Sequence, residues 1–276
     1  MRCLAIANQK GGVGKTTTCV NLSAALASMQ NRVLLIDLDP QGNASVGCGI
    51  DSRALEHSAY DVLLGDETIS QARVTPDELG FDVLPSNGDL TAAEMHLMHQ
   101  EGREYALKNA IRDVRGDYDW VIIDCPPSLN LLTLNALAAA DSVFIPMQCE
   151  YYALEGLTAL LDTVEQVRAS VNPKLEIEGL LRTMYDVRNN LSAAVSDQLT
   201  ENFGEQVYRT VVPRNVRIAE APSYGLPVTR YDPSSKGALA YLSLAGEMLR
   251  RHEKKSSDRF AKVLGRQPEE SLESKI

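Results

Sequence analysis

The sequence from residue 9 to residue 17 reads Gln9-Lys10-Gly11-Gly12-Val13-Gly14-Lys15-Thr16-Thr17, with the apolar run Cys3–Ala7 before it and a helix-like segment, Thr16–Met29, overlapping its end. A strand that leads through a glycine-rich turn into a helix N-terminus points backbone N–H groups and the helix dipole at a bound polyphosphate. In such a loop Lys15 reaches the β- and γ-phosphates, and the Thr16 hydroxyl binds Mg²⁺. The pattern therefore predicts a nucleoside triphosphate site whose nucleotide contacts come from Gly11, Gly12, Val13, Gly14, Lys15, Thr16 and Thr17.

Lys10 is an unusual residue at the start of this loop. The usual phosphate-loop pattern has a glycine five residues before Gly14, where this chain has Gln9, and a second lysine follows it. Two like charges in one loop are unfavourable unless an anion lies between them. A Gly-x-Gly alone would indicate only a turn. The complete string of strand, glycine turn, Gly-Lys-Thr and helix indicates triphosphate binding.

Aspartates follow two other apolar runs that we expect to be strands. Residues 33–36 lead into Asp37-Leu38-Asp39-Pro40-Gln41-Gly42-Asn43, and residues 120–123 lead into Asp124-Cys125-Pro126-Pro127. A carboxylate at the end of a buried strand is costly without a partner, and a hydrated Mg²⁺ beside phosphates supplies one. Either aspartate alone would indicate a turn cap, but with the loop upstream both predict metal roles for Asp37 and Asp124 beside Thr16. Asp39 lies past the strand end, where it can accept a hydrogen bond from an attacking water.

Short apolar runs alternate with longer amphipathic segments along the chain. The expected strands are Cys3–Ala7, Val33–Asp37, Phe81–Leu84, Trp120–Asp124, Ser142–Pro146, Ile177–Met184 and Val207–Val212. The expected helices are Thr16–Met29, Thr91–Val114, Leu129–Ala139, Leu154–Ser170, Leu191–Phe203 and Ser234–Arg250. This alternation predicts an α/β fold of the P-loop type, doubly wound, with a mostly parallel sheet and helices on both faces. Ligands bind at the carboxyl ends of the strands in such sheets.

Length and composition favour one intracellular domain. The 276 residues can bury a substantial core, and we expect a single domain over residues 1–252 followed by a charged tail over residues 253–276. The five cysteines are scattered, which indicates reduced thiols rather than a zinc site or disulfide framework. We see no apolar run long enough to span a bilayer and no leader pattern, so we expect a cytoplasmic protein. The net charge of −10 argues against a basic coat but not against a local basic patch.

Three motifs together resemble one family. Residues 10–17, 37–43 and 124–128 are similar to the deviant Walker A, A′ and B motifs of the ParA/MinD ATPases. Residues 212–217, 220–223 and 231–233 further resemble the short chromosomal ParA proteins, also called Soj. The resemblance extends over about residues 1–250.

The resemblance implies an ATPase that segregates chromosomes or plasmids. Such a protein forms a sandwich homodimer with ATP and Mg²⁺, binds double-stranded DNA without sequence preference on the nucleoid, and is reset by hydrolysis that a ParB-type partner stimulates. Lys10 then matches the signature lysine that reaches the partner subunit's nucleotide, a role like that of an arginine finger. The implied catalytic residues are Lys10, Lys15 and Asp39, the last positioning the water. Pro213 and Asn215 are implied to lie near the adenine.

A local basic cluster favours DNA over a membrane as the binding surface. Between residues 209 and 236 there are five basic residues and two acidic ones, in a chain that is acidic overall. Nothing indicates base stacking, so sequence-independent phosphate contact is the better interpretation. The predicted DNA contacts are Arg214, Arg217 and Lys236, with Arg188 a weaker one, whereas solvated charge is the better interpretation for Arg209 and Arg230.

Three alternatives remain open from the sequence. A MinD-like membrane ATPase needs a C-terminal amphipathic helix. Phe260, Val263 and Leu264 do share a helical face, and the basic residues Arg259, Lys262 and Arg266 are nearby. However, Gly265 and Pro268 follow, which disfavours such a helix.

An iron–sulfur relative needs subunit-bridging cysteines, and Cys125 has no recognisable second cysteine. A nucleotide-gated scaffold would bind ATP with negligible turnover. A hydrolysis assay with and without DNA and partner separates this scaffold from an ATPase.

Overall fold

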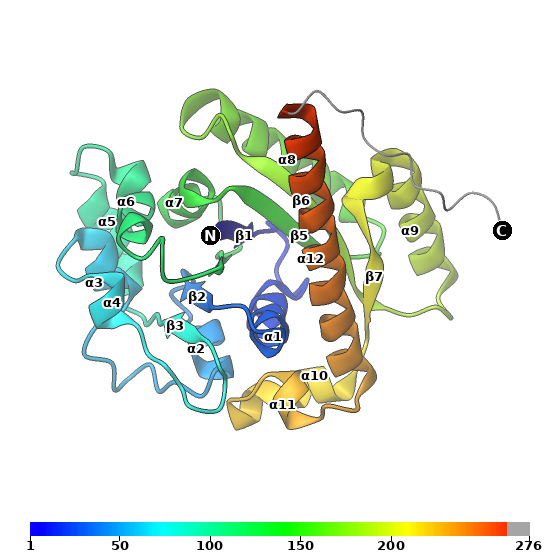
Figure 1. Cartoon of the computed structure of the whole chain (residues 1–276), viewed down its shortest axis with the longest axis horizontal. Coiled ribbons are helices and arrows are strands. Elements are labelled where there is room, and N and C mark those ends of the chain that lie inside the picture. The colour runs from blue at the N-terminus through cyan, green and yellow to red at the C-terminus, as the bar shows by residue number, and fades with distance from the viewer. Residues whose placement is uncertain (264–276) are drawn as a thin grey trace.

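One parallel sheet organises the molecule, for which a computed structural model describes the backbone of residues 1–263 and the side chains of residues 1–257. The sheet has seven strands in the order β3-β2-β4-β1-β5-β6-β7, all paired in parallel (Figure 1). The strands are β1 (Arg2–Ile6), β2 (Val33–Asp37), β3 (Asp82–Leu84), β4 (Trp120–Asp124), β5 (Ser142–Gln148), β6 (Glu176–Tyr185) and β7 (Val207–Pro213). The predicted sheet is confirmed, and each expected strand overlaps an observed one.

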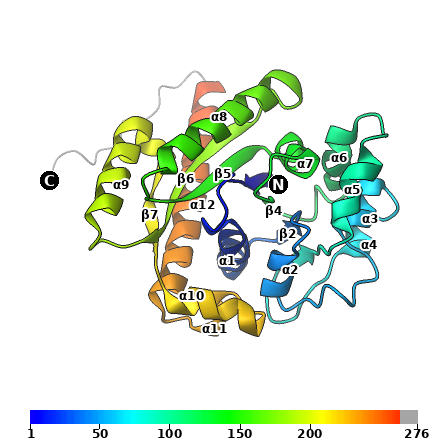
Figure 2. The same ribbon diagram turned by 180° about the vertical axis from the view of Figure 1, so that it is seen from behind.

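Helices connect the strands and cover both faces of the sheet. Those in the described residues are α1 (Lys15–Ser28), α2 (Asn43–Gly47), α3 (Ala59–Leu64), α4 (Ile69–Ala72), α5 (Leu90–Leu97), α6 (Ala106–Asp113), α7 (Leu131–Ala139), α8 (Ala153–Ser170), α9 (Asn190–Phe203), α10 (Val216–Glu220), α11 (Val228–Tyr231) and α12 (Lys236–Val263), with 3₁₀ turns η1 (Arg103–Tyr105), η2 (Gly204–Gln206) and η3 (Ala221–Tyr224). Figure 1 shows α12 lying across one face, and Figure 2 shows α8 on the opposite face.

Successive side chains of each strand pack alternately into two separate hydrophobic cores, one on each face of the sheet. In β1, Leu4 and Ile6 belong to the core under α1 and α12, whereas Cys3 and Ala5 belong to the core under α7 and α8. This alternation follows from the two-residue period of a strand. Because both faces are covered, β1, β2, β4 and β5 are apolar except at their ends, as is usual in parallel sheets. Strands β6 and β7, at one side of the sheet, also carry polar residues in their interiors, among them Glu178 and Thr210.

Two expected helices differ from the observed ones. The single helix expected over residues 91–114 is wrong, because α5 ends at Leu97 and α6 begins only at Ala106. Gly102 lies between them with φ +68°, a left-handed conformation that interrupts a right-handed helix. Helix α12 is longer than expected and runs to Val263 instead of ending at Arg250. The first residues of the predicted charged tail are therefore helical, and the domain boundary at residue 252 stays a prediction.

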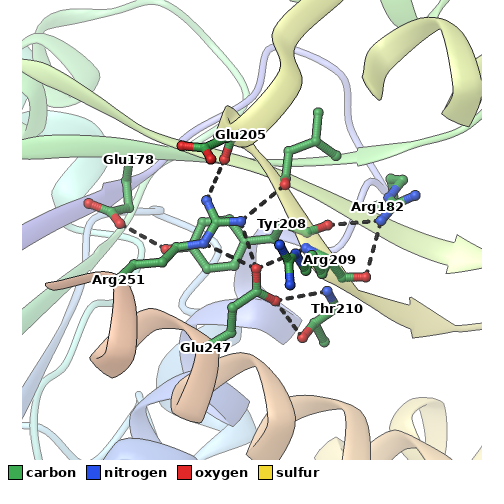
Figure 3. Close-up of polar contacts among 9 residues, drawn as sticks. Glu178, Arg182, Glu205, Tyr208, Arg209, Thr210, Glu247 and Arg251 are labelled. Carbon is green, nitrogen blue, oxygen red and sulfur yellow. Dashed lines mark hydrogen bonds and ion pairs between the residues drawn. The ribbon is translucent and has the colours of Figure 1, made fainter. Parts of the chain in front are cut away.

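A carboxylate on α12 fixes this helix to the edge of the sheet (Figure 3). Glu247 accepts hydrogen bonds from the backbone N–H of Arg209 at 2.9 Å and from the N–H and hydroxyl of Thr210 at 2.8 and 2.7 Å. One turn further along, Arg251 pairs with Glu247 at 2.6 Å and lies 3.9 Å above the ring of Tyr208. Strand β7 and the middle of α12 are thus held as one unit.

A bulge in the sheet places a second carboxylate under α12. The pairing of β5 with β6 shifts between Ile177 and Gly179, so that Glu178 is the extra residue. The Tyr208 hydroxyl donates to Glu178 at 2.8 Å, and His252 Nε2 lies 3.3 Å from the same carboxylate. A Cβ on Gly179 would lie 2.7 Å from the Tyr208 ring, so only glycine fits beside this contact.

The segment on which the membrane alternative depends lies mostly outside the described residues. Side chains are described only to residue 257, so those of Phe260, Val263 and Leu264 and of their basic neighbours lie outside the described part of the chain. Within residues 1–263, no helix combines the length and the apolar character that crossing a bilayer demands.

Replacing Glu247 with alanine should destabilise the protein markedly. The substitution leaves the Arg209 and Thr210 donors without their acceptor and separates Arg251 from its partner, which costs about 2–3 kcal/mol of unfolding free energy. Urea denaturation of the nucleotide-free protein measures this as a lowered midpoint. The matched control is Glu253→Ala, an exposed glutamate on the same helix. Equal midpoints for the two variants would contradict the role of Glu247.

Candidate functional site

The loop between β1 and α1 turns at two glycines in the left-handed region of backbone conformation. Gly12 has φ +74° and Gly14, directly before α1, has φ +88°, values that other residues rarely adopt. A Cβ added to Gly11 or Gly12 would meet no atom within 4 Å. These glycines therefore face open space instead of packed protein, and the loop leaves room for a ligand close to its backbone.

Side chains from two neighbouring strands hold the loop in this shape. Thr183, near the end of β6, donates its hydroxyl to the Val13 carbonyl at 2.8 Å. Gln148, at the end of β5, donates its side-chain amide to the Gly12 carbonyl at 3.2 Å. The carbonyls are thereby drawn toward the protein. The loop is preorganised for a ligand, and neither anchoring residue was among the site residues predicted from sequence.

Lys15 is a buried cation at the start of α1. Its side chain lies almost wholly inside the protein, and Nζ is 3.5 Å from the Lys10 carbonyl. The described part of the chain offers it no carboxylate within ion-pair distance. A buried ammonium without an anionic partner is unfavourable, so its position fits a site that receives an anion.

Asp37, at the end of β2, fixes the turn that follows it. Its Oδ2 accepts from the backbone N–H and the hydroxyl of Ser45, both at 2.8 Å, and its Oδ1 accepts from the Asp39 N–H at 3.1 Å. These bonds give the buried carboxylate a structural task that the sequence did not reveal. Its predicted role as a metal ligand stays a prediction.

Asp124, at the end of β4, is paired in register with Asp37 on β2. The thiol of Cys19 donates to its Oδ1 at 3.3 Å, and the Thr16 side chain approaches the same carboxylate. Its Oδ2 is buried and accepts no hydrogen bond from any described residue. A buried carboxylate oxygen without a donor fits a bound cation.

Burial and mutual repulsion change the protonation of these two aspartates. Burial, and then the charge of Asp37, raise the pKa of Asp124 well above its ordinary value, and burial raises the pKa of Asp37. Among the side chains of residues 1–257, no three from histidine, cysteine, aspartate or glutamate are arranged to hold a metal ion. A cation at Asp124 would therefore take most of its ligands from phosphate and water, as Mg²⁺ commonly does.

Asp39 follows β2 and is half-buried. Its Oδ1 accepts from the Gln41 N–H at 3.0 Å, and its carbonyl accepts from the Ser86 hydroxyl at 2.9 Å. The backbone is thus fixed from the segment that follows β3. The side chain has a defined position at the same edge of the sheet as Asp124.

Lys10 forms an ion pair within its own subunit. Its Nζ lies 2.6 Å from Oε2 of Glu150, and both side chains are partly exposed. The Lys10 N–H also donates to Asn8 Oδ1 at 2.9 Å, which fixes the start of the loop. Glu150 was not predicted from sequence, because nothing in a sequence indicates which of many surface carboxylates meets a given lysine.

The residues expected near adenine lie where β7 ends. Pro213 is the last residue of β7, and Asn215 caps α10 by accepting from the N–H groups of Arg217 and Ile218 at 2.9 and 3.3 Å. This cap occupies the Asn215 side-chain oxygen. Its amide nitrogen is the group left for a ligand.

The predicted DNA-contacting residues have different surroundings. Arg217 pairs with both acidic residues of its cluster, Glu220 at 2.8 Å and Asp232 at 3.2 Å. Arg188 forms a two-pronged pair with Asp186 at 3.0 Å.

Two members of that set have no such pair. Arg214 and Lys236 are both exposed, and the described residues give neither an ion pair. Arg214 directly follows β7, and Lys236 begins α12. They are the cationic side chains most available to an external anion in this group.

Comparison with known proteins supports the family that the three motifs indicate. A family model described as an AAA domain matches residues 1–177. The chain is 52% identical over 265 residues to a Chromosome partitioning protein ParA of Caulobacter vibrioides, covering 95% of this chain and 98% of that one. It is 53% identical over 248 residues to the Sporulation initiation inhibitor protein Soj of Bacillus subtilis, covering 90% and 98%.

The chain belongs to the ParA/Soj family of chromosome-partitioning ATPases. The family predicted from the three motifs is therefore confirmed. A solved structure also matches, named Cobyrinic Acid a,c-diamide synthase from Mycobacterium smegmatis, with bound ATP analog and magnesium. It is 43% identical with a TM-score of 0.81, covering 92% of this chain and 96% of that one. This match agrees with the doubly wound parallel-sheet fold described above.

Replacing Asp124 with asparagine should stabilise the metal-free, nucleotide-free protein. The change removes one of two adjacent buried charges and keeps an oxygen for the Cys19 thiol, so we expect a gain of about 1–3 kcal/mol in unfolding free energy. Because the folded pKa lies above the unfolded one, the native carboxyl holds a proton that the unfolded chain releases. Wild-type stability should therefore rise as pH falls through the neutral range, and Asp124→Asn should flatten that slope.

Asp119, directly before the same strand, is the control with the opposite sign. Hydrogen bonds from Arg32 lower its pKa to about 2, so Asp119→Asn should destabilise the protein at neutral pH. Thermal unfolding of both variants in chelator checks this contrast. Destabilisation by Asp124→Asn would refute the account of an uncompensated buried pair.

Proposed function

We propose that this protein is a DNA-partitioning ATPase. ATP and Mg²⁺ binding drives two subunits into a sandwich dimer, the dimer binds DNA without sequence preference, and hydrolysis stimulated by a ParB-type partner resets it. One observation carries the proposal: a buried lysine without a carboxylate partner and a buried carboxylate oxygen without a donor, both among the described residues, flank an open glycine loop. That arrangement suits a magnesium triphosphate, and the magnesium-bound ATP analog of the Mycobacterium smegmatis structure supports the choice.

The proposed nucleotide contacts follow from the loop. Backbone N–H groups of residues 11–17 and the dipole of α1 receive the phosphates. Lys15 contributes a buried positive charge that no carboxylate of the described residues neutralises. Thr16 and Asp124 would hold Mg²⁺, which supplies charge neutralisation at the phosphates. Asp37 would lie beside this ion as the second carboxylate, and it also fixes the turn that follows β2. Pro213 and Asn215 would contact the adenine.

Hydrolysis is assigned to two further residues. Asp39 positions the attacking water, since it is held at the carboxyl edge by its own backbone contacts. Lys10 completes the site of the partner subunit, where its charge offsets the charge that develops on the transferred phosphoryl group. Turnover therefore requires the dimer.

DNA binding is assigned to the basic residues near the ends of β6 and β7. Arg214 and Lys236 lead, because no carboxylate of the described residues pairs with them, and Arg188 and Arg217 contribute less because they already have acidic partners. A few charges on one subunit give little affinity at physiological salt, whereas a two-fold dimer doubles the contacts on one duplex. ATP thereby controls DNA binding, and the proposed location is the nucleoid within the cytoplasm.

Lys15→Ala and Asp39→Ala should fail in opposite ways. Without Lys15 the phosphates lose their buried cation, so we expect nucleotide affinity to fall by at least about 100-fold, given the cost of losing a charge-assisted contact. Without Asp39 the loop and Thr16 are intact, so the protein should bind ATP, dimerise and persist as a dimer with negligible turnover. Fluorescent-nucleotide titration and size exclusion with ATP check both. Wild-type hydrolysis by Asp39→Ala would disprove its assignment.

DNA binding should require ATP and depend on Arg214 and Lys236. We expect Arg214→Glu and Lys236→Glu to weaken binding equally on unrelated sequences, and the log–log salt slope to fall by about 0.9 for each phosphate that the variant no longer neutralises. Gel shifts at several salt concentrations with ATP, ADP or a non-hydrolysable analogue measure this. Arg209→Glu is the control, since that arginine is predicted to be solvated. Equal binding by wild type with ADP and with ATP would overturn the switch.

A further inference from the structure

Glu150 is the counter-ion of Lys10 in the nucleotide-free subunit. The two charged groups are 2.6 Å apart, although the lysine side chain is 39% exposed and the glutamate side chain is 50% exposed. Glu150 lies two residues beyond the end of β5, and its backbone is fixed by hydrogen bonds to the Gln148 carbonyl at 3.0 Å and from the Ala153 N–H at 2.9 Å. The pair therefore joins two segments whose backbones are both held in place.

The contact lies where charge changes on nucleotide binding. Lys10 lies in the loop that leads to Lys15 at the start of α1, and Lys15 Nζ is 3.5 Å from the Lys10 carbonyl. Glu150 neutralises Lys10, whereas Lys15 has no carboxylate partner in the described residues. Phosphates that arrive at the loop repel Glu150 and attract Lys10, and both effects weaken the pair.

We propose that Glu150 is a positioning residue that holds Lys10 in the monomer and sets how readily the subunit dimerises. This inference rests on the proposed cross-subunit role of Lys10. A lysine paired with Glu150 cannot at the same time neutralise the partner subunit's phosphates, so the ion pair opposes dimerisation. Exposed pairs of this kind are weak, which corresponds to about a two- to fivefold effect on the dimerisation constant.

Charge removal at Glu150 tests the inference. With a non-hydrolysable ATP analogue and Mg²⁺, Glu150→Gln should dimerise at an about two- to fivefold lower protein concentration than wild type in sedimentation velocity. The shift should shrink at high salt, because exposed pairs are screened. Glu155→Gln is the matched control, since this exposed glutamate on α8 has no ion pair in the described residues and should keep the wild-type threshold.

Lys10→Gln identifies which part of the account fails if the shift is absent. We expect Lys10→Gln to abolish dimerisation and the double variant Lys10→Gln/Glu150→Gln to behave like it, while the monomers of both variants keep much of their nucleotide affinity. If Lys10→Gln dimerises like wild type, the cross-subunit role is wrong and the inference falls with it. If Lys10→Gln fails to dimerise but Glu150→Gln keeps or raises the wild-type threshold, the role of Lys10 stands and only the inference is overturned.

Discussion

Unneutralised charge at one edge of the sheet is the constraint on which the site depends. Two carboxylates, Asp37 and Asp124, end neighbouring strands side by side, and Lys15 is buried at the start of α1 without a carboxylate partner among the described residues. Each group alone reduces the stability of the fold. A polyphosphate with Mg²⁺ would satisfy the lysine and the Asp124 oxygen together. The sheet is therefore arranged for a ligand that carries both charges, at a cost in stability to the ligand-free protein.

The rest of the molecule keeps this edge rigid. Thr183 and Gln148 fix the glycine loop from β6 and β5, so that the loop does not have to be ordered by the ligand. Behind the sheet, Glu247 of α12 accepts a hydrogen bond from Thr210 of β7, and Glu178 of β6 lies 3.3 Å from His252 of α12. Because α12 also packs against α1, the helix that begins with Lys15 has a fixed partner on its outer side.

The sequence predicted the sheet and its charged edge well, for a physical reason. A strand buried on both faces is a continuous apolar run, and the aspartate that ends it is conspicuous in the chain. Helices of four to six residues, such as α3 and α4, were missed because they are too short to show a helical period. The anchoring by Thr183 and the pairing of Lys10 with Glu150 join segments far apart in sequence. Counting the basic and acidic residues between residues 209 and 236 also did not reveal that Glu220 and Asp232 both form ion pairs with Arg217.

The central claim is that a magnesium triphosphate binds a site that the ligand-free protein already forms at the edge of the sheet, and that only the ATP-bound dimer binds DNA. The most direct measurement is the mass of the complex formed on a short duplex, by sedimentation equilibrium with a non-hydrolysable ATP analogue or with ADP. The account predicts two 30.2 kDa chains on the duplex with the analogue and none with ADP. A single chain bound equally with either nucleotide would contradict it.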